Sequence, residues 1–304
     1  MSYKVALIII YNHQFNKNID ILEDIYRGRF SSIYHLIPFY NGDKSNVIPV
    51  YENSYYFQGY VAQAFNSFYK PEYTHYFFVA DDMVINPILN ENNYYTHLKL
   101  SAQTCFLPNY KSFHDSAFWV RTKEAYAYSM NLKGLEVQGQ LPEYAEALRK
   151  FHEKGLEIEP LKYSQIWGPI SSPRNLGRTL FKDREWGRLL SSSILKVKYD
   201  LPYPLVGGYS DIFVLSSDMI KDFCHYCGIT ATTKLFVEIA IPTIMVLTAK
   251  EIVTEKELAL QGMSLWTEKD YEVLEPFDND LNKLMCNFPQ NFMYLHPIKL
   301  SKWK

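Results

Sequence analysis

Short apolar runs alternate with amphipathic stretches along the first hundred residues of the chain. The apolar runs are typical of strands that are buried on both faces, and the amphipathic stretches have the spacing of helices. Because the predicted strands and helices alternate along the chain, we expect βαβ units and a mostly parallel sheet. The predicted strands are residues 4–10, 31–39, 47–51 and 76–80, and the predicted helices are residues 18–27 and 58–68.

Beyond residue 100 the pattern is looser. A strand is predicted at residues 113–120 and a helix at residues 121–131. Residues 141–154 have a strong apolar side and are followed by Gly155, which predicts a helix that ends at the glycine. The remaining predictions are a strand at residues 212–215, a helix at 219–226, a helix that starts or kinks at Pro242, and a helix or the entry to a last strand at 251–260.

The length of the chain allows one large domain or two small ones, and its composition allows a sizeable core. It has 304 residues, of which 47% are apolar, and its formal net charge is -2, so nothing in the overall charge points to nucleic acid. The apolar run at residues 5–10 is too short for a signal peptide, and no stretch approaches the about 20 apolar residues of a membrane span. No repeat or linker interrupts the chain. We therefore expect a single cytoplasmic domain over residues 1–304.

The segment at residues 174–198 is strongly basic, with seven basic and two acidic side chains. It also has an apolar side, so it could lie on anionic lipid at the inner face of the membrane or bind acidic groups. The alternative is a solvated helix face in an insertion. The basic residues are Arg174, Arg178, Lys182, Arg184, Arg188, Lys196 and Lys198.

Two adjacent acids, Asp81 and Asp82, directly follow the apolar run at residues 76–80. Open α/β sheets bind their ligands at the carboxyl ends of strands, which is where this pair is expected to lie. Neighbouring carboxylates repel each other and attract a cation. Oxygen ligands suit Mg²⁺ or Mn²⁺, ions that usually hold phosphates as well. An acidic turn that merely caps the strand is the alternative interpretation.

Four stretches of the chain resemble the GT-A glycosyltransferases, which use nucleotide-sugar donors. Residues 8–12 (IIIYN) resemble the first strand and the loop that touches the base, and residues 79–84 (VADDMV) resemble the DxD motif. Residues 207–218 (GGYSDIFVLSSD) resemble the acceptor side of the sheet, and residues 296–303 (HPIKLSKW) resemble the tail of the glycogenin-like retaining branch. The chain departs from these patterns, because Ala80 replaces the first aspartate, Lys299 replaces a tail glycine, and the proline between Lys302 and Trp303 is missing.

The resemblance implies a Rossmann-like α/β fold with a mixed, mostly parallel sheet and a helical insertion. Residues 1–100 would form the nucleotide-binding half, residues 101–200 the helical and basic insertion, and residues 201–304 the acceptor half with the tail. It also implies a metal-dependent hexosyltransferase of polysaccharide biosynthesis. The enzyme would move a sugar from a nucleotide-diphosphate donor, expected to be a UDP-sugar, to a glycan or lipid-linked acceptor.

The same resemblance assigns the binding residues. Tyr11 and Asn12 would contact the nucleotide base. Asp82, with Asp81 and His296, would hold Mn²⁺ or Mg²⁺. Asp81 and Lys302 would bind the diphosphate of the donor.

Chemistry adds candidates for catalysis. If the sugar is inverted, a carboxylate must take the proton of the acceptor hydroxyl, and the candidates are Glu238 and Asp211. Glu238 lies in an apolar stretch, where burial would raise its pKa toward that of a useful base; a carboxylate on a helix surface is the alternative. If the sugar is retained, the resemblance implies that no dedicated base is needed, and Asp211 would instead orient the sugar. Trp119 is expected in the core, with a sugar site as the alternative.

Two other functions are kept as alternatives. A nucleotidyltransferase also places acids at a strand end, but residues 11–16 (YNHQFN) contain neither the glycine nor the basic residue of its phosphate loop. A non-catalytic module that binds carbohydrate or nucleotide on the same fold would account for the missing first aspartate. Metal-dependent turnover of a donor separates this module from the transferase.

Overall fold

The computed structural model describes residues 3–169 and 197–304. The basic segment at residues 174–198 therefore lies almost wholly outside the described residues, and its predicted membrane contact stays a prediction. Within the described part of the chain, no helix is long and apolar enough to cross a membrane.

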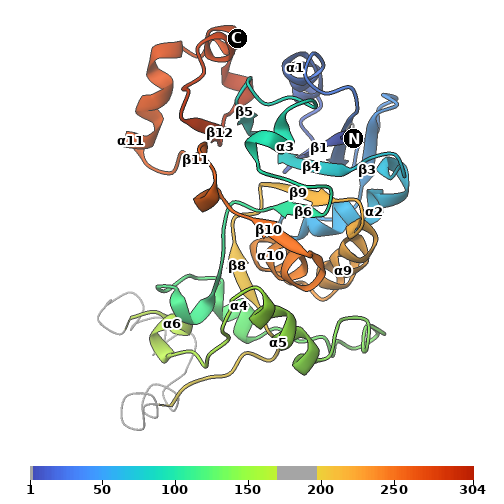
Figure 1. The fold of residues 1–304 in the computed structure, drawn as a ribbon, viewed down its shortest axis with the longest axis vertical. Helices are drawn as coiled ribbons and strands as arrows, with labels where there is room; N and C mark the ends of the chain where they lie inside the picture. Colours follow the sequence, from blue (N-terminus) through green and yellow to red (C-terminus); the bar gives the residue numbers. More distant parts are fainter. Residues whose placement is uncertain (1–2, 170–196) are drawn as a thin grey trace.

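A seven-stranded sheet forms the centre of the molecule, in the order β10-β6-β9-β4-β1-β2-β3 (Figure 1). Strands β3, β2, β1 and β4 run parallel to one another, β9 is antiparallel to both β4 and β6, and β10 is parallel to β6. The predicted mixed, mostly parallel α/β sheet is thus confirmed. The strands are β1 (Val5–Ile10), β2 (Ile33–Pro38), β3 (Val47–Val50), β4 (His75–Ala80), β6 (Thr104–Phe106), β9 (Ile212–Ser216) and β10 (Glu251–Val253).

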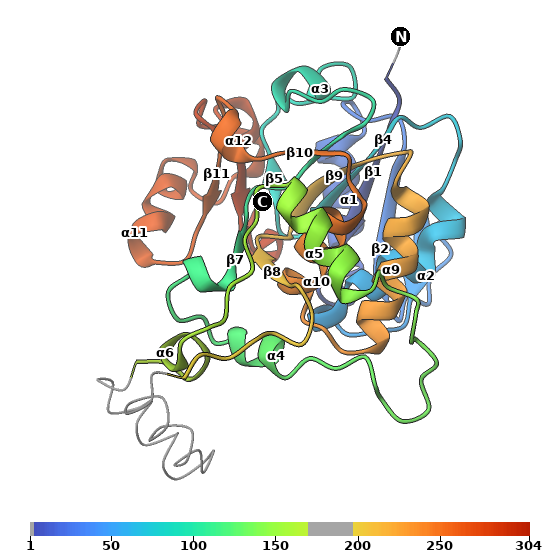
Figure 2. The same ribbon diagram turned by 60° about the horizontal axis from the view of Figure 1, so that its bottom comes forward.

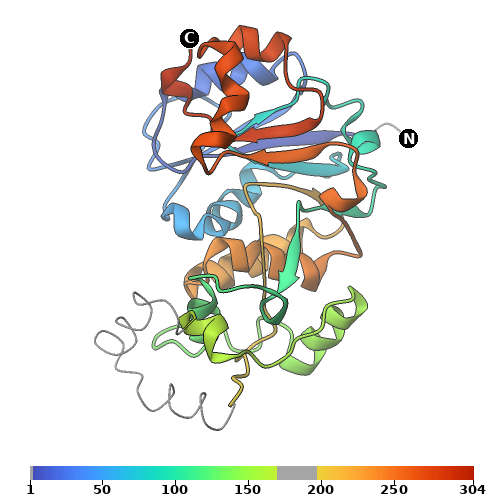
Figure 3. The same cartoon turned by 90° about the vertical axis from the view of Figure 1, so that its left-hand side faces the viewer.

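Helices cover both faces of this sheet and create two cores (Figure 3). Every residue of β1 and β4 is buried, as the continuous apolar runs predicted. Ala6, Ile8 and Ile10 face one core, whereas the alternate residues of β1 face the other. The first core lies against α2 (Gln58–Phe68), α9 (Ile220–Thr232) and α10 (Val237–Thr248), and the second against α1 (Lys17–Tyr26), α3 (Tyr94–His97) and α12 (Leu281–Cys286).

A smaller sheet joins the middle of the chain to its last strand. In it, β12 (Phe292–His296) lies between β11 (Gln261–Ser264) and the two-residue β5 (Val84–Ile85). Strand β5 pairs antiparallel with β12, so that Val84 faces Leu295. Because β5 begins two residues after Asp82, this pairing brings the end of β12 to the acid pair. The short helix α11 (Glu268–Tyr271) follows β11 (Figure 1).

The remaining elements lie together at one end of the molecule (Figure 1), the end that comes forward in Figure 2. A ribbon of β7 (Tyr110–Ser112) and β8 (Val206–Gly208) connects them to the rest. The helices there are α4 (Thr122–Tyr126), α5 (Tyr144–Glu153) and α6 (Tyr163–Trp167). Because β6 from residues 104–106 joins the central sheet, the stretch between residues 101 and 200 is not wholly a helical insertion.

Several element predictions need correction beyond residue 100. The strand predicted at residues 113–120 is wrong. The strand that pairs with β8 is β7, which ends just before these residues, and the chain then turns into the 3₁₀ helix Phe113–Asp115. The helix predicted at 121–131 is only the short α4, and α9 runs past the predicted end to Thr232. Helix α10 continues through Pro242, although proline removes the amide that would bond to the carbonyl of Glu238. The predicted alternatives at 251–260 resolve into β10 and the 3₁₀ helix Glu255–Glu257.

Candidate active site

The candidate site lies where β1 and β4 end and β9 begins. The amide of Asp81 donates to the carbonyl of Ile10 (2.9 Å), and the amide of Ala80 donates to the carbonyl of Asp211 (2.8 Å). Since β9 is antiparallel to β4, its amino end lies at the carboxyl edge of the parallel strands. The acid pair and Asp211 therefore share one edge of the sheet, where open α/β sheets bind ligands.

Asp81 is turned into the protein. Its side chain is 2% exposed, and its two carboxylate oxygens accept hydrogen bonds from the amide of Asn12 (3.2 Å) and from Nδ2 of Asn18 (3.2 Å). Burial and the charge of Asp82 raise the pKa of Asp81 to about 7, against the lowering effect of these hydrogen bonds. The Asp81 carboxylate thus supports the loop after β1 and is not presented to a ligand.

Asp82 is the accessible member of the pair, and it meets the tail of the chain. Its Oδ1 is 3.0 Å from Nε2 of His296, and its carbonyl accepts a hydrogen bond from the amide of Ile298 (2.6 Å). The side chain of Asp82 is 30% exposed, whereas that of His296 is 6% exposed. One side-chain contact and one backbone hydrogen bond thus join two stretches that lie 214 residues apart in the sequence, in addition to the pairing of β5 with β12.

His296 lies among acids and a phenol. Its Nδ1 is 2.6 Å from the hydroxyl of Tyr209 and 4.0 Å from Oδ2 of Asp211. Burial alone would lower the pKa of His296, but the hydrogen bond with Asp82 and the charges of the surrounding aspartates outweigh it, so the pKa is raised. Burial raises the pKa of Asp211, and the charge of His296 opposes this effect. The charges of His296 and of its neighbouring acids therefore influence each other in both directions.

The spacing of Asp82 and His296 fits two ligands of one divalent ion. Neighbouring ligands of an octahedral ion with bonds of about 2.1 Å lie about 3.0 Å apart, and Oδ1 of Asp82 is 3.0 Å from Nε2 of His296. Among residues 3–169 and 197–304, no group of three or more His, Cys, Asp or Glu side chains is arranged to hold a metal ion. An ion at this position would therefore need water or substrate phosphate for its other ligands.

Two cavities open beside these residues. The first, which we call the aromatic cavity, has a volume of about 460 Å³, and the second, the arginine cavity, has a volume of about 260 Å³. Glu238 is the one described residue that lines both. The aromatic cavity is lined by Asn109, Lys111, Phe113, Ser116, Ala117, Phe118, Trp119, Gly207, Gly208, Tyr209, Glu238, Ser264 and Trp266, and the arginine cavity by Asn12, Ser54, Tyr55, Phe57, Arg121, Asp211, Phe236, Val237 and Glu238.

Glu238 lies in the first turn of α10 and forms part of the wall between the two cavities. Burial and the charge of Asp211 raise its pKa to about 7, although Arg121 and His296 act in the opposite direction. A carboxylate with this pKa is half ionised near neutral pH and can accept a proton efficiently there. Glu238 is half-buried, so its environment lies between the buried base and the surface carboxylate that the sequence left open.

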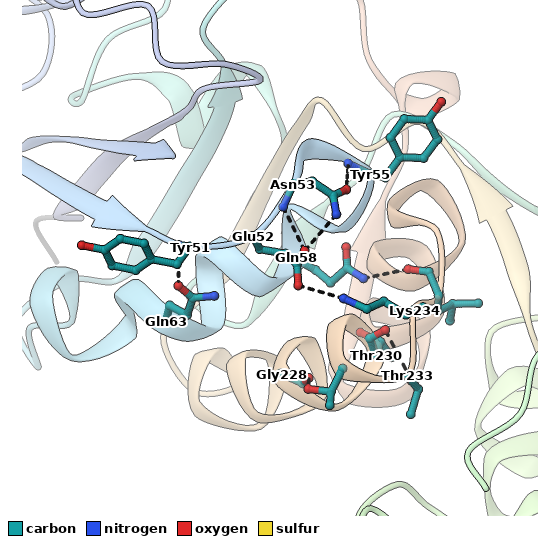
Figure 4. A network of polar contacts seen from close by, with 12 residues as sticks. Tyr51, Glu52, Asn53, Tyr55, Gln58, Gln63, Gly228, Thr230, Thr233 and Lys234 are labelled. Carbon is teal, nitrogen blue, oxygen red and sulfur yellow. Dashed lines mark hydrogen bonds and ion pairs between the residues drawn. The ribbon is translucent and has the colours of Figure 1, made fainter. Parts of the chain in front are cut away.

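The guanidinium of Arg121 lies close to two aromatic rings in the arginine cavity. Its guanidinium carbon lies 4.1 Å from the ring centroid of Phe236 and 4.9 Å from that of Tyr55, and the guanidinium also pairs with Glu124. Polar contacts fix the two ring-bearing loops to each other, as Figure 4 shows: Glu52 pairs with Lys234 (3.2 Å), and Nε2 of Gln58 donates to the carbonyl of Leu235 (2.8 Å). The cation is thus preorganised beside Asp211 and Glu238.

The structure brings most of the predicted site residues together. Asn12, Asp211 and Glu238 line one cavity, and Asp82 and His296 are in contact. Tyr11 needs correction, because its ring is fully buried and its hydroxyl bonds to Nδ1 of His35 (2.9 Å), so the ring cannot stack on a base. The apolar run at residues 5–10 does not by itself reveal which way the next residue, Tyr11, faces.

Lys302 does not join the acid cluster. It is an exposed residue in the 3₁₀ helix Leu300–Lys302, and no hydrogen bond or ion pair links it to the acids among the described residues. The basic group near the acids is instead Arg121, which the sequence interpretation did not single out.

Trp119, expected in the core, and Trp266 both line the aromatic cavity. In the sequence, the pair Gly207-Gly208 indicated that another part of the chain approaches the backbone of β8 closely.

Comparison with protein-family models finds no match for this chain, and comparison with curated proteins finds none either.

Proposed function

We propose that the chain is a glycosyltransferase that moves a sugar from a nucleotide-diphosphate donor to a glycan or lipid-linked acceptor with the help of a divalent cation. The contact between Asp82 and His296 carries this proposal. The resemblance to GT-A enzymes rests on separate stretches, and it requires the DxD-like loop and the tail histidine to lie together. Their proximity across most of the chain supports the resemblance independently of its motifs.

The residues around the two cavities would have different roles in the transfer. Mn²⁺ or Mg²⁺, held by Asp82 and His296, would stabilise the charge of the departing diphosphate. Arg121 would orient the donor from the arginine cavity, taking the role that the sequence gave to Lys302. Glu238 could accept the proton of the acceptor hydroxyl if the reaction inverts the sugar, and Asp211 would orient the sugar ring.

Donor binding tests the proposal directly. UDP-, GDP-, CMP- and dTDP-sugars are each added with and without Mn²⁺, and the thermal stability of the protein is measured. A ligand present at about a hundred times its dissociation constant adds about 2.7 kcal/mol of stability. We expect one nucleotide class to stabilise the protein only when the metal is present.

Asp82→Ala is expected to abolish this stabilisation. The substitution removes the carboxylate but leaves the backbone carbonyl that accepts from Ile298, so the tail should stay in place. Asp278→Ala is a matched control, because this carboxylate is 81% exposed and pairs with Lys283. A protein that responds to no nucleotide, with or without metal, would contradict the proposal and favour a binding module.

Exposed aromatic rings at the neighbouring strand ends are better placed than Tyr11 to hold the base. Phe39 follows β2 and is 60% exposed, Tyr51 follows β3 and is 63% exposed, and their ring centroids are 5.8 Å apart. Phe39 also has a φ of 55°, a conformation that bulky residues rarely adopt and that clusters at functional sites.

Phe39→Ala is expected to weaken donor binding by about 1–3 kcal/mol, the usual contribution of a base stacked on a ring. Titration calorimetry with the stabilising nucleotide measures the change. Ile88→Ala, at a side chain that is 51% exposed on another loop, should have no effect. Unchanged affinity in Phe39→Ala would place the base elsewhere.

A further inference from the structure

We propose that the aromatic cavity binds a sugar ring at the end of a glycan, and that this glycan is the acceptor. This inference rests on the proposed transferase function in one respect, which is that the bound glycan is the acceptor of the transferred sugar. The recognition of a sugar by this cavity follows from the cavity itself. Its lining combines flat aromatic surfaces with separate polar groups, which is the combination that a sugar ring requires.

Two tryptophans supply the flat surfaces. The ring of Trp119 lies against Phe113, with centroids 6.0 Å apart and an interplanar angle of 16°. Trp266 lines the same cavity and is 68% exposed, the largest exposed fraction among the large apolar side chains of the described residues. An indole left in water at the wall of a cavity loses hydration when a flat apolar surface covers it, so it favours such a ligand.

Glycines make room for one of these rings. A Cβ at position 207 would lie 2.8 Å from the Trp119 ring, and a Cβ at position 208 would lie 2.2 Å from the carbonyl oxygen of Asn109. Both distances are shorter than real carbon contacts, so any other residue would displace its neighbour. The pair Gly207-Gly208 therefore lets Trp119 lie directly on the backbone of β8 and brings Asn109 to the cavity wall.

Polar groups line the same cavity as the aromatic surfaces. Asn109, Ser116 and Ser264 offer an amide and two hydroxyls, and Lys111 and Glu238 add a cation and a carboxylate. A pyranose ring has C–H groups on its faces and hydroxyls around its edge, so it can stack on indole and still satisfy these groups. An acyl chain would desolvate the same groups without replacing their hydrogen bonds, which costs free energy. The volume of about 460 Å³ is within the range of small-molecule sites.

The position of the cavity fits an acceptor site. Glu238 forms part of its wall, and the ring of Trp266 lies edge-on to His296 with centroids 6.3 Å apart. A sugar in the aromatic cavity would thus have Glu238 on one side and the Asp82–His296 pair close by. In the transfer, the acceptor oxygen bonds to the anomeric carbon, its proton passes to a base, and the carbon–oxygen bond to the phosphate breaks, releasing the nucleoside diphosphate with the electron pair.

Saccharide binding without any donor tests the proposal. The probes are methyl glucosides, methyl galactosides, N-acetylglucosamine, lactose, maltose, cellobiose and glucuronic acid, with octanoate as an acyl probe. Tryptophan fluorescence follows the titration, because two indoles line the cavity. We expect at least one saccharide to give a saturable change, and octanoate to give none.

Substitutions then locate the site. Trp266→Ala should weaken saccharide binding by about tenfold or more, a loss of about 1.4 kcal/mol. Gly207→Ala should also weaken it by displacing Trp119, and it provides a second variant if the first folds poorly. Tyr144→Ala is the control, since this ring is 42% exposed on α5 and lies outside both cavities.

The outcomes separate this inference from the proposed function. Nucleotide binding without binding of any saccharide overturns the inference and leaves the transferase. Saccharide binding that survives both Trp266→Ala and Gly207→Ala also overturns it, as does binding of octanoate in place of sugars. Saccharide binding that depends on these residues, in a protein that binds no nucleotide, supports the sugar site and overturns the transferase.

Discussion

Glu238→Gln is expected to lower turnover by about two to four orders of magnitude while leaving donor binding in place. The substitution keeps the size of the side chain and removes its ability to accept a proton. Because Glu238 is the described residue common to both cavities, it lies where an acceptor hydroxyl and a donor sugar would meet. Initial rates with saturating donor measure the loss, and the donor-induced thermal shift shows that the site is still formed.

The pH dependence gives a second readout of the same residue. Glu238 must be ionised to accept a proton, and burial raises its pKa to about 7. The rate of the wild-type enzyme should therefore rise with pH through about 7 and level off above it. Glu153→Gln, at an exposed residue that ends α5, is the control and should leave the profile unchanged. If Glu238→Gln keeps its rate within a few-fold, or if the product retains the configuration of the donor sugar, the role of base is wrong.

Asp81→Asn is expected to stabilise the metal-free protein by about 2–4 kcal/mol at pH 8 and by almost nothing at pH 4. The pKa of Asp81 is raised from 3.8 to about 7 in the folded protein, mainly by burial. The folded state thus holds a proton that the unfolded state has already lost. The contribution of Asp81 to stability is full below about pH 4 and is lost as the pH rises through about 7. Asparagine stays neutral at all these pH values and avoids the loss.

The neighbours of Asp81 can accommodate the amide. The new Oδ1 can still accept from the amide of Asn12, and the side chain of Asn18 can rotate its oxygen toward the new Nδ2. Thermal and denaturant unfolding in the presence of a chelator, from pH 4 to pH 8, measure the difference. Asp24→Asn on the exposed side of α1 is the control. If the variant is no more stable than the wild type at any pH in this range, then the buried charge of Asp81 does not destabilise the folded protein.

The central sheet could be predicted from the sequence because its apolar runs are local. The first four predicted strands and the helix at residues 58–68 are confirmed. The strand predicted at 113–120 failed because the segment turns into a 3₁₀ helix and its Trp119 packs on Gly207 of β8, about ninety residues later in the chain. Strand β5 has only two residues, too few for any periodic pattern, yet it decides where β12 lies.

The candidate site could be predicted only where a motif marked it. The resemblance placed Asp82 beside His296, and the apolar surroundings of Glu238 indicated its burial. Arg121 was missed because its position depends on Tyr55 and Phe236, which reach it from distant segments. Tyr11 was wrongly offered to the base because a continuous apolar run does not tell which of its residues meets solvent.

The contacts of the tail with Asp82 come late in the sequence. All seven strands of the central sheet lie before residue 254, whereas the contacts to Asp82 need residues 296 and 298. On the proposed mechanism, a chain that stops before β12 would contain every strand of the main sheet but would lack one of the two protein ligands of the cation. The capacity to bind the cation would thus depend on a segment that the main sheet does not contain.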